Sequence, residues 1–108
     1  MKPDQIRLLR RLTLNDTEAM NQALTGEMSE SSSLDARTVA LVRLAALLSV
    51  DSDPATFQWA AELGVAAGVD DDDIYNALAV IAPIIGIARL TSALPHLMTA
   101  LDLEVVED

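Results

Sequence analysis

The sequence contains no cysteine, and this absence excludes several chemistries at once. The chain forms no disulfide, no thiolate nucleophile and no thiolate metal site. Cations are also scarce: seven Lys and Arg stand against 17 Asp and Glu, and the formal net charge is −10. Because nucleic-acid binding depends on clustered Lys and Arg, this balance argues against a nucleic-acid partner.

Aromatic residues and long apolar runs are few as well. Only Phe57, Trp59 and Tyr75 are aromatic, although apolar residues make up 51% of the chain. Leu, Ala, Val and Ile must therefore fill the interior, and this composition favours helices. The longest apolar run, residues 77–88, is shorter than the ~20 residues that a membrane span needs, and the start does not resemble a signal peptide. We expect a cytoplasmic protein with no membrane partner.

The length of 108 residues fits a single domain, residues 1–108. We predict an all-α fold of about six helices. The apolar content exceeds what one small core needs, which indicates that other subunits cover part of the surface. The chain is therefore expected to form a homo-oligomer.

Capping signals divide the N-terminal third. Residues 6–12 present an apolar helix side, Asn15 with Glu18 predicts the start of a second helix, and Gly26 its end. The serine-rich residues 27–33 are predicted to form a loop.

Stronger signals follow in the remainder. Asp35 and the pair Asp53-Pro54 predict two helix starts, and Gly68 suits a left-handed closing residue. The acidic residues 70–73 predict a further helix start, since a helix N-terminus favours negative charge. They lack the alternating spacing of a calcium loop, so no metal site is predicted.

Proline and glycine residues indicate where helices bend or end in the last third of the chain. Pro83 predicts a kink or break in the helix that starts near residue 70, because proline removes a backbone hydrogen bond. With Gly86 close by, a last helix is expected over residues 87–101, with a second bend at Pro95. Residues 102–108 are expected to fray.

Residues 34–101 resemble the carboxymuconolactone decarboxylase and alkylhydroperoxidase D superfamily. The segment LDARTVALVRLAAL is similar to that family's Leu-x-x-x-Arg-Glu-Leu segment, with Arg37 at its arginine. QWAAELGVAAGVDDDDIYNAL resembles its glycine-terminated helix and the acidic helix start that follows, and Gly86 fits a recurring glycine. The resemblance implies a homotrimer or homohexamer.

The same resemblance indicates which reactive groups are missing. Disulfide reductases of the family carry Cys-x-x-Cys-x-x-x-His, with the histidine eight residues before the helix-ending glycine. Counting back from Gly68 places Ala60 at the histidine and Asp53 and Thr56 at the cysteines, while Thr38 stands at the family's glutamate. A thiol peroxidase is therefore excluded.

Two functions stay open. The first is a decarboxylase-like lyase that acts on a small carboxylated lactone or similar acid without a cofactor. Its carboxylate would be held by Arg37 or Arg43. The second is a non-catalytic scaffold or protein-binding module. The candidate pocket residues are Arg37, Thr38, Arg43, Thr56, Trp59 and Ala60.

Three of the residues singled out have alternative interpretations. Arg43 is either an ion-pair partner, with Glu62 as candidate, or an anion-binding residue. Trp59 either anchors a core or interface, or lines a pocket. The sole histidine, His96, is either a displaced general acid or base, whose partner carboxylate would come from the helix starting at Pro54 or from a neighbouring subunit, or an ordinary surface or interface residue.

Overall fold

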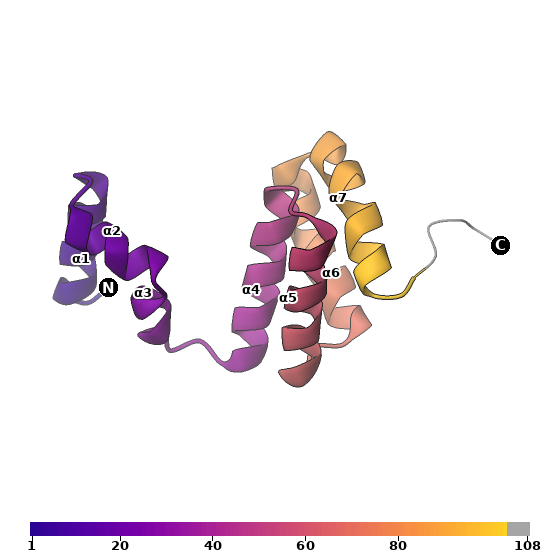
Figure 1. Ribbon diagram of the computed structural model, residues 1–108, viewed down its shortest axis with the longest axis horizontal. Helices are drawn as coiled ribbons and strands as arrows, with labels where there is room; N and C mark the ends of the chain where they lie inside the picture. The colour runs from indigo at the N-terminus through magenta and orange to yellow at the C-terminus, as the bar shows by residue number, and fades with distance from the viewer. Residues whose placement is uncertain (104–108) are drawn as a thin grey trace. The chain divides into compact units, whose positions relative to one another are not determined.

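A computed structural model describes residues 1–103, and all of its regular structure is helical. The described residues form seven helices: α1 (Pro3–Thr13), α2 (Thr17–Leu24), α3 (Glu27–Glu30), α4 (Ala36–Ser49), α5 (Pro54–Ala66), α6 (Asp71–Ile85) and α7 (Ile87–Ala100) (Figure 1). The all-α prediction is confirmed. Seven helices agree with the prediction of about six, and the additional one is the short helix α3, which lies where the sequence predicted a loop.

The chain divides into two compact units, Met1–Ser33 and Leu34–Asp108, which are described separately. The single domain expected from the length therefore stays a prediction. No helix within residues 1–103 has the length and apolar character needed to cross a membrane. Of the tail that was expected to fray, residues 104–108 lie outside the described residues.

In the first unit, Asp16 and not Asn15 caps α2. The Asp16 carboxylate accepts a 2.9 Å hydrogen bond from the Ala19 backbone N–H, whereas Asn15 has a left-handed backbone with φ 57°. An N-cap residue needs an extended backbone, so the prediction of Asn15 is wrong by one residue. Arg11 of α1 contacts the same carboxylate at 3.0 Å, and it ties the two helices together.

In the second unit, the predicted starts of α4 and α5 are confirmed. Asp35 accepts a 2.7 Å hydrogen bond from the Thr38 N–H, and Asp53 accepts a 2.8 Å bond from the Thr56 N–H. Pro54 occupies the first position of α5, where its missing N–H costs no helical hydrogen bond. A short turn joins the two helices, which lie side by side in antiparallel directions (Figure 1).

The start of α6 is also as predicted, but its end is not. Asp70 and Asp73 exchange backbone-to-carboxylate hydrogen bonds of 2.8 and 3.0 Å at the first turn. The helix then continues through Pro83 and stops only at Gly86, so a break at Pro83 is wrong. Pro83 and Ala79, whose carbonyl it leaves unbonded, are both exposed, and water can satisfy that carbonyl.

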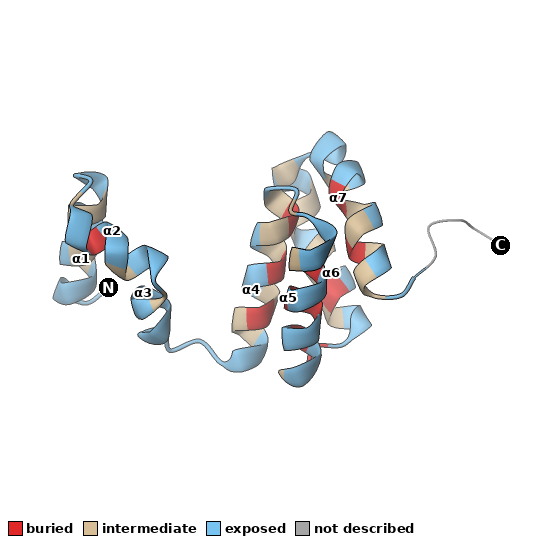
Figure 2. Ribbon diagram, viewed as in Figure 1, coloured by how far each residue is buried: buried red, intermediate tan, exposed pale blue. Residues whose placement is uncertain are grey.

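The core of this unit lies between α4, α5, α6 and α7. Its largest fully buried side chains are Phe57, Leu48 and Leu97, and Figure 2 shows the buried residues on the facing sides of the helices. Helix α5 packs most extensively against α4 and α7. The turn after α4 is thereby held next to α7.

Candidate functional site

The positions that the resemblance assigns to the family's chemistry are not gathered at one place. Ala60 is 4% exposed and belongs to the core, where it carries no ionisable group. Thr56 lies one turn earlier on α5, near the α4–α5 turn, and its hydroxyl donates to the Asp53 carboxylate at 3.0 Å. Thr38 lies at the opposite end of the hairpin, because α4 and α5 are antiparallel. Thr38 and Thr56 therefore cannot line one small cavity within this chain.

Asp53 is occupied as a helix cap. The Thr56 backbone N–H, and then its hydroxyl, lower the pKa of the Asp53 carboxyl. Both donors stabilise the charged carboxylate, so Asp53 remains ionised and is a poor proton donor at neutral pH.

Arg37 is neutralised by a carboxylate of another helix. Its guanidinium donates from Nε to Asp73 Oδ2 at 3.2 Å and from Nη2 to Asp73 Oδ1. The Asp73 side chain is only 15% exposed, and this two-point pair lowers the pKa of its carboxyl to about 2. The pair joins α4 to the start of α6.

Arg43 and Trp59 lie outside the core. Arg43 is exposed and forms no ion pair with any residue of 1–103, since its expected partner Glu62 accepts a 3.2 Å hydrogen bond from Gln58 instead. The guanidinium stays in solvent, and the predicted pair with Glu62 is wrong for this chain. Trp59 is 52% exposed, so it anchors no core here.

The polar side chains that do converge come from α7. Arg89, Ser92 and His96 are spaced i, i+3 and i+7, so they share one side of the helix. We call them the α7 stripe. Each contacts the end of α4 or the turn after it: Arg89 donates to the Ser49 carbonyl at 2.5 Å, Ser92 donates to Asp51 Oδ2 at 2.7 Å, and His96 Nδ1 lies 3.9 Å from Asp51 Oδ1.

Asp51 is the centre of this arrangement. Its backbone is left-handed, with φ 54°, which few residues other than glycine, Asn and Asp adopt readily. The next residue is fixed by a 3.3 Å hydrogen bond from the Ser52 N–H to the Leu47 carbonyl. Both carboxylate oxygens are thus presented to α7, one to Ser92 and one to His96.

The two ring nitrogens of His96 have different surroundings. Nδ1 is buried and has no hydrogen-bond partner, with Asp51 as the carboxylate beside it. The His96 side chain as a whole is 39% exposed. Nε2 forms no hydrogen bond within residues 1–103 and is not buried, so solvent reaches it. The buried Phe57 ring lies against the imidazole, with a centroid separation of 6.4 Å. A buried unpaired nitrogen costs about 1–3 kcal/mol, which favours closure of the gap to Asp51.

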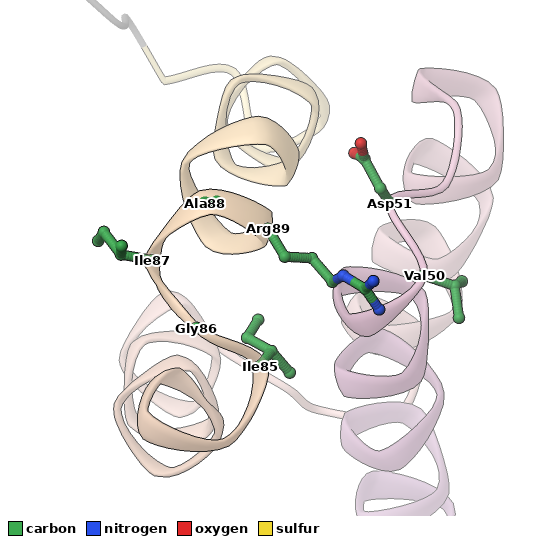
Figure 3. Close-up of a pocket in the computed structure, with 7 residues that line it drawn as sticks. All are labelled: Val50, Asp51, Ile85, Gly86, Ile87, Ala88 and Arg89. Atoms are coloured by element: carbon green, nitrogen blue, oxygen red, sulfur yellow. The ribbon is translucent and has the colours of Figure 1, made fainter.

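An open hollow lies beside the stripe, where α6 ends and α7 begins. It is lined by Val50, Asp51, Ile85, Gly86, Ile87, Ala88 and Arg89 (Figure 3). Figure 3 shows the Arg89 side chain reaching from α7 toward the end of α4. Arg89 forms no ion pair within residues 1–103, and four of the five guanidinium N–H groups are unused. The hollow therefore combines an apolar wall, the Asp51 carboxylate to which Ser92 donates, and a cation that forms no ion pair within the described chain.

A comparison with protein-family models decides the family. The carboxymuconolactone decarboxylase family model matches residues 17–97, which include α2 to α6, most of α7 and the whole α7 stripe. The chain belongs to that family. The match begins 17 residues before the segment on which the resemblance was based, at the start of α2. No curated protein and no solved structure gives a significant match.

Among the residues of this candidate site, the sequence had pointed only to His96. Arg89, Ser92 and Asp51 were not predicted as functional. The i, i+3, i+7 spacing of Arg89, Ser92 and His96 on a mainly apolar helix is a signal that was present in the sequence. The partner Asp51 could not be found in that way, because only the folded hairpin brings it to α7.

Proposed function

We propose that this member of the carboxymuconolactone decarboxylase family binds a small carboxylic acid, a carboxylated lactone or a similar acid, in the hollow at the α6–α7 break and acts on it as a lyase. The observation that carries the proposal is Arg89, a cation without a carboxylate partner among residues 1–103 at the rim of this hollow. A guanidinium is well suited to a carboxylate because its N–H groups form parallel charge-assisted hydrogen bonds. Thiol chemistry has no place in the proposal, since the chain has no cysteine.

The sequence had favoured Arg37 and Arg43 as the residues that bind the carboxylate, and we now assign this role to Arg89. Arg37 already binds the Asp73 carboxylate through two N–H groups, so a substrate would have to displace that partner. Arg43 is exposed and does not line the hollow at the α6–α7 break. It serves as the matched control for Arg89.

The test is a titration by calorimetry with a carboxylated γ-lactone and with its methyl ester. We expect the acid to bind and the ester to bind at least about tenfold more weakly, because the ester has lost the charge that Arg89 recognises. Arg89→Ala should weaken binding of the acid by a similar factor, and Arg43→Ala should leave it within about twofold. Equal binding of acid and ester, loss of binding in Arg43→Ala alone, or no binding at millimolar concentration would each overturn the proposal.

A second function, an oligomeric scaffold, is favoured by the exposed apolar side chains of α4 and α6. Val42 of α4 is 54% exposed, and Val80 and Ile84, one turn apart on α6, are 70% and 81% exposed. Val42 and Val80 border a groove with little polar lining, together with half-buried Leu41 and Ile81. A contiguous apolar surface of this kind is typical of a protein–protein contact, here with further copies of the chain in a homotrimer or homohexamer.

Light scattering on the purified chain tests the scaffold. Val80→Asp is expected to shift a trimer or hexamer toward monomer, since it would bury an unpaired charge. Val65→Asp, at a residue 73% exposed on α5, is the control and should leave the mass unchanged. A monomer in the unmodified protein, or equal dissociation by both variants, would contradict this location of the contact.

A further inference from the structure

We propose that His96, oriented by Asp51, is the proton-transferring residue of this protein, and that this histidine lies on α7 and not at the α5 position where the resemblance puts one. The inference rests on the proposed binding of a small acid beside Arg89, and it adds the group that would act on the bound molecule.

The first argument is that the two ring nitrogens of His96 have different surroundings. Nδ1 is buried, and the neighbouring carboxylate oxygen, Asp51 Oδ1, lies 3.9 Å away. A proton on Nδ1 would be stabilised by that carboxylate, which leaves the lone pair on Nε2. Solvent reaches Nε2, so this nitrogen can take a proton from a bound molecule or give one to it. Hydrogen bonds of catalytic pairs are commonly long before a ligand binds, and 3.9 Å agrees with such a pair.

The second argument is that Asp51 is held in place by several contacts. Ser92 donates to its second oxygen at 2.7 Å, and the left-handed turn fixes its backbone. Because Ser92 lies one helical turn before His96, a single face of α7 supplies both contacts. Asp51 acts as a positioning residue, and Ser92 positions Asp51.

The third argument is location. The His96 ring lies against Phe57 of α5, which is one turn before Ala60 on the same side of that helix. The flanking residues of His96 on α7, Ala93 and Leu97, share the buried cluster that contains Ala60. The His96 imidazole therefore extends from α7 to its boundary with α5. It lies in the neighbourhood of Ala60, the α5 position at which the resemblance puts a histidine.

The fourth argument is the distance between His96 and Arg89, the residue proposed to bind the carboxylate. Arg89 and His96 are seven residues apart on one side of α7, about 10 Å along the axis. Arg89 and Asp51 both line the hollow, and Asp51 Oδ1 lies 3.9 Å from His96 Nδ1, whereas His96 itself is not among the lining residues. A bound acid therefore has to extend from Arg89 past Asp51 to reach Nε2. The step assigned to His96 is a proton transfer alone, and it does not include the bond cleavage of the proposed lyase reaction: Nε2 takes the proton from the carbon next to the lactone carbonyl, the electron pair stays on the resulting enolate, and the imidazolium returns a proton to that carbon. No electrons are gained or lost.

Two measurements test the inference. As the only histidine, His96 gives a single set of imidazole signals, and its tautomer can be read from long-range ¹H–¹⁵N correlations. We expect the Nδ1–H form in the unmodified protein and loss of that preference in Asp51→Asn, a substitution that keeps the left-handed turn but removes the charge. An Nε2–H form, or a tautomer that Asp51→Asn does not change, would overturn the inference even if no acid binds.

The second measurement is exchange of the lactone's carbon-bound proton for deuterium in D₂O, followed by NMR. His96→Asn should slow the exchange by about 100-fold while the acid still binds, and Asp51→Asn should slow it less. Thr99→Ala on the same helix is the control. Binding with exchange unaffected by His96→Asn would overturn this inference and leave the proposed function standing, whereas a failure of the acid to bind would count against the proposed function itself.

Discussion

The hydroxyl of Ser92 on α7 donates a 2.7 Å hydrogen bond to Asp51 Oδ2 in the turn after α4, across 41 residues of sequence. This bond links α7 to the hairpin of α4 and α5. It also fixes the carboxylate that faces His96.

Ser92→Ala should lower the free energy of unfolding by about 1 kcal/mol, since it removes one hydrogen bond to a partly exposed carboxylate. Thr91→Ala is the matched control, because the Thr91 hydroxyl contacts only carbonyls of its own helix, and it should change stability by less than about 0.5 kcal/mol. Urea unfolding of both variants measures the difference. Equal effects would mean that the bond to Asp51 adds nothing.

Gly86→Ala should destabilise the protein by about 1–3 kcal/mol. Gly86 has φ 85° and ψ 157°, a region that is essentially limited to glycine, although a Cβ there would meet no atom within 4 Å. Gly68 has φ 86°, and the 2.9 Å hydrogen bond from the Val69 N–H to the Gly64 carbonyl closes α5 across it, as is typical of the more permissive left-handed region. Gly68→Ala should cost about 1–2 kcal/mol. Thermal unfolding that ranks Gly68→Ala as the more damaging change would contradict the backbone assignment at Gly86.

Phe57→Ala should cost about 3–5 kcal/mol, because its fully buried ring leaves a cavity between α5 and α7. Trp59→Ala removes a larger ring, but that ring is 52% exposed, and the loss for the isolated chain should stay below about 1.5 kcal/mol. Denaturant unfolding at low protein concentration compares them. A larger loss for Trp59→Ala would show that its ring is buried, for instance by another subunit.

Acid should weaken the second unit through Asp73. Its folded pKa, about 2, lies below the ordinary value of 3.8, chiefly because of Arg37 and then the Asp70 N–H. The charged form therefore stabilises the fold above about pH 4, and this contribution is lost as the pH falls toward 2. Asp73→Asn should lower stability at pH 7 and flatten the pH dependence between 4 and 2. An unchanged slope in thermal unfolding at several pH values would contradict this.

The starts of α4, α5 and α6 could be predicted from sequence because their determinants are local. Asp35, Asp53 and Asp70 each cap a helix whose first donors lie within three residues, and Gly68 closes α5 as expected. The continuation of α6 through Pro83 could not be predicted, because it depends on which side of the helix faces solvent. The candidate site depends still more on tertiary structure, since Asp51 meets Ser92 and His96 only after the hairpin packs on α7.

The central claim is that the functional site lies at the α6–α7 break and the α7 stripe, and a backbone NMR titration with a carboxylated γ-lactone tests it most directly. The account predicts that the largest shifts occur at Asp51, Gly86, Arg89 and His96, and that Arg89→Ala moves the titration to a ligand concentration at least about tenfold higher. Shifts centred on Thr38 and Asp73, at the far end of α4, or no shifts at millimolar ligand, would contradict it.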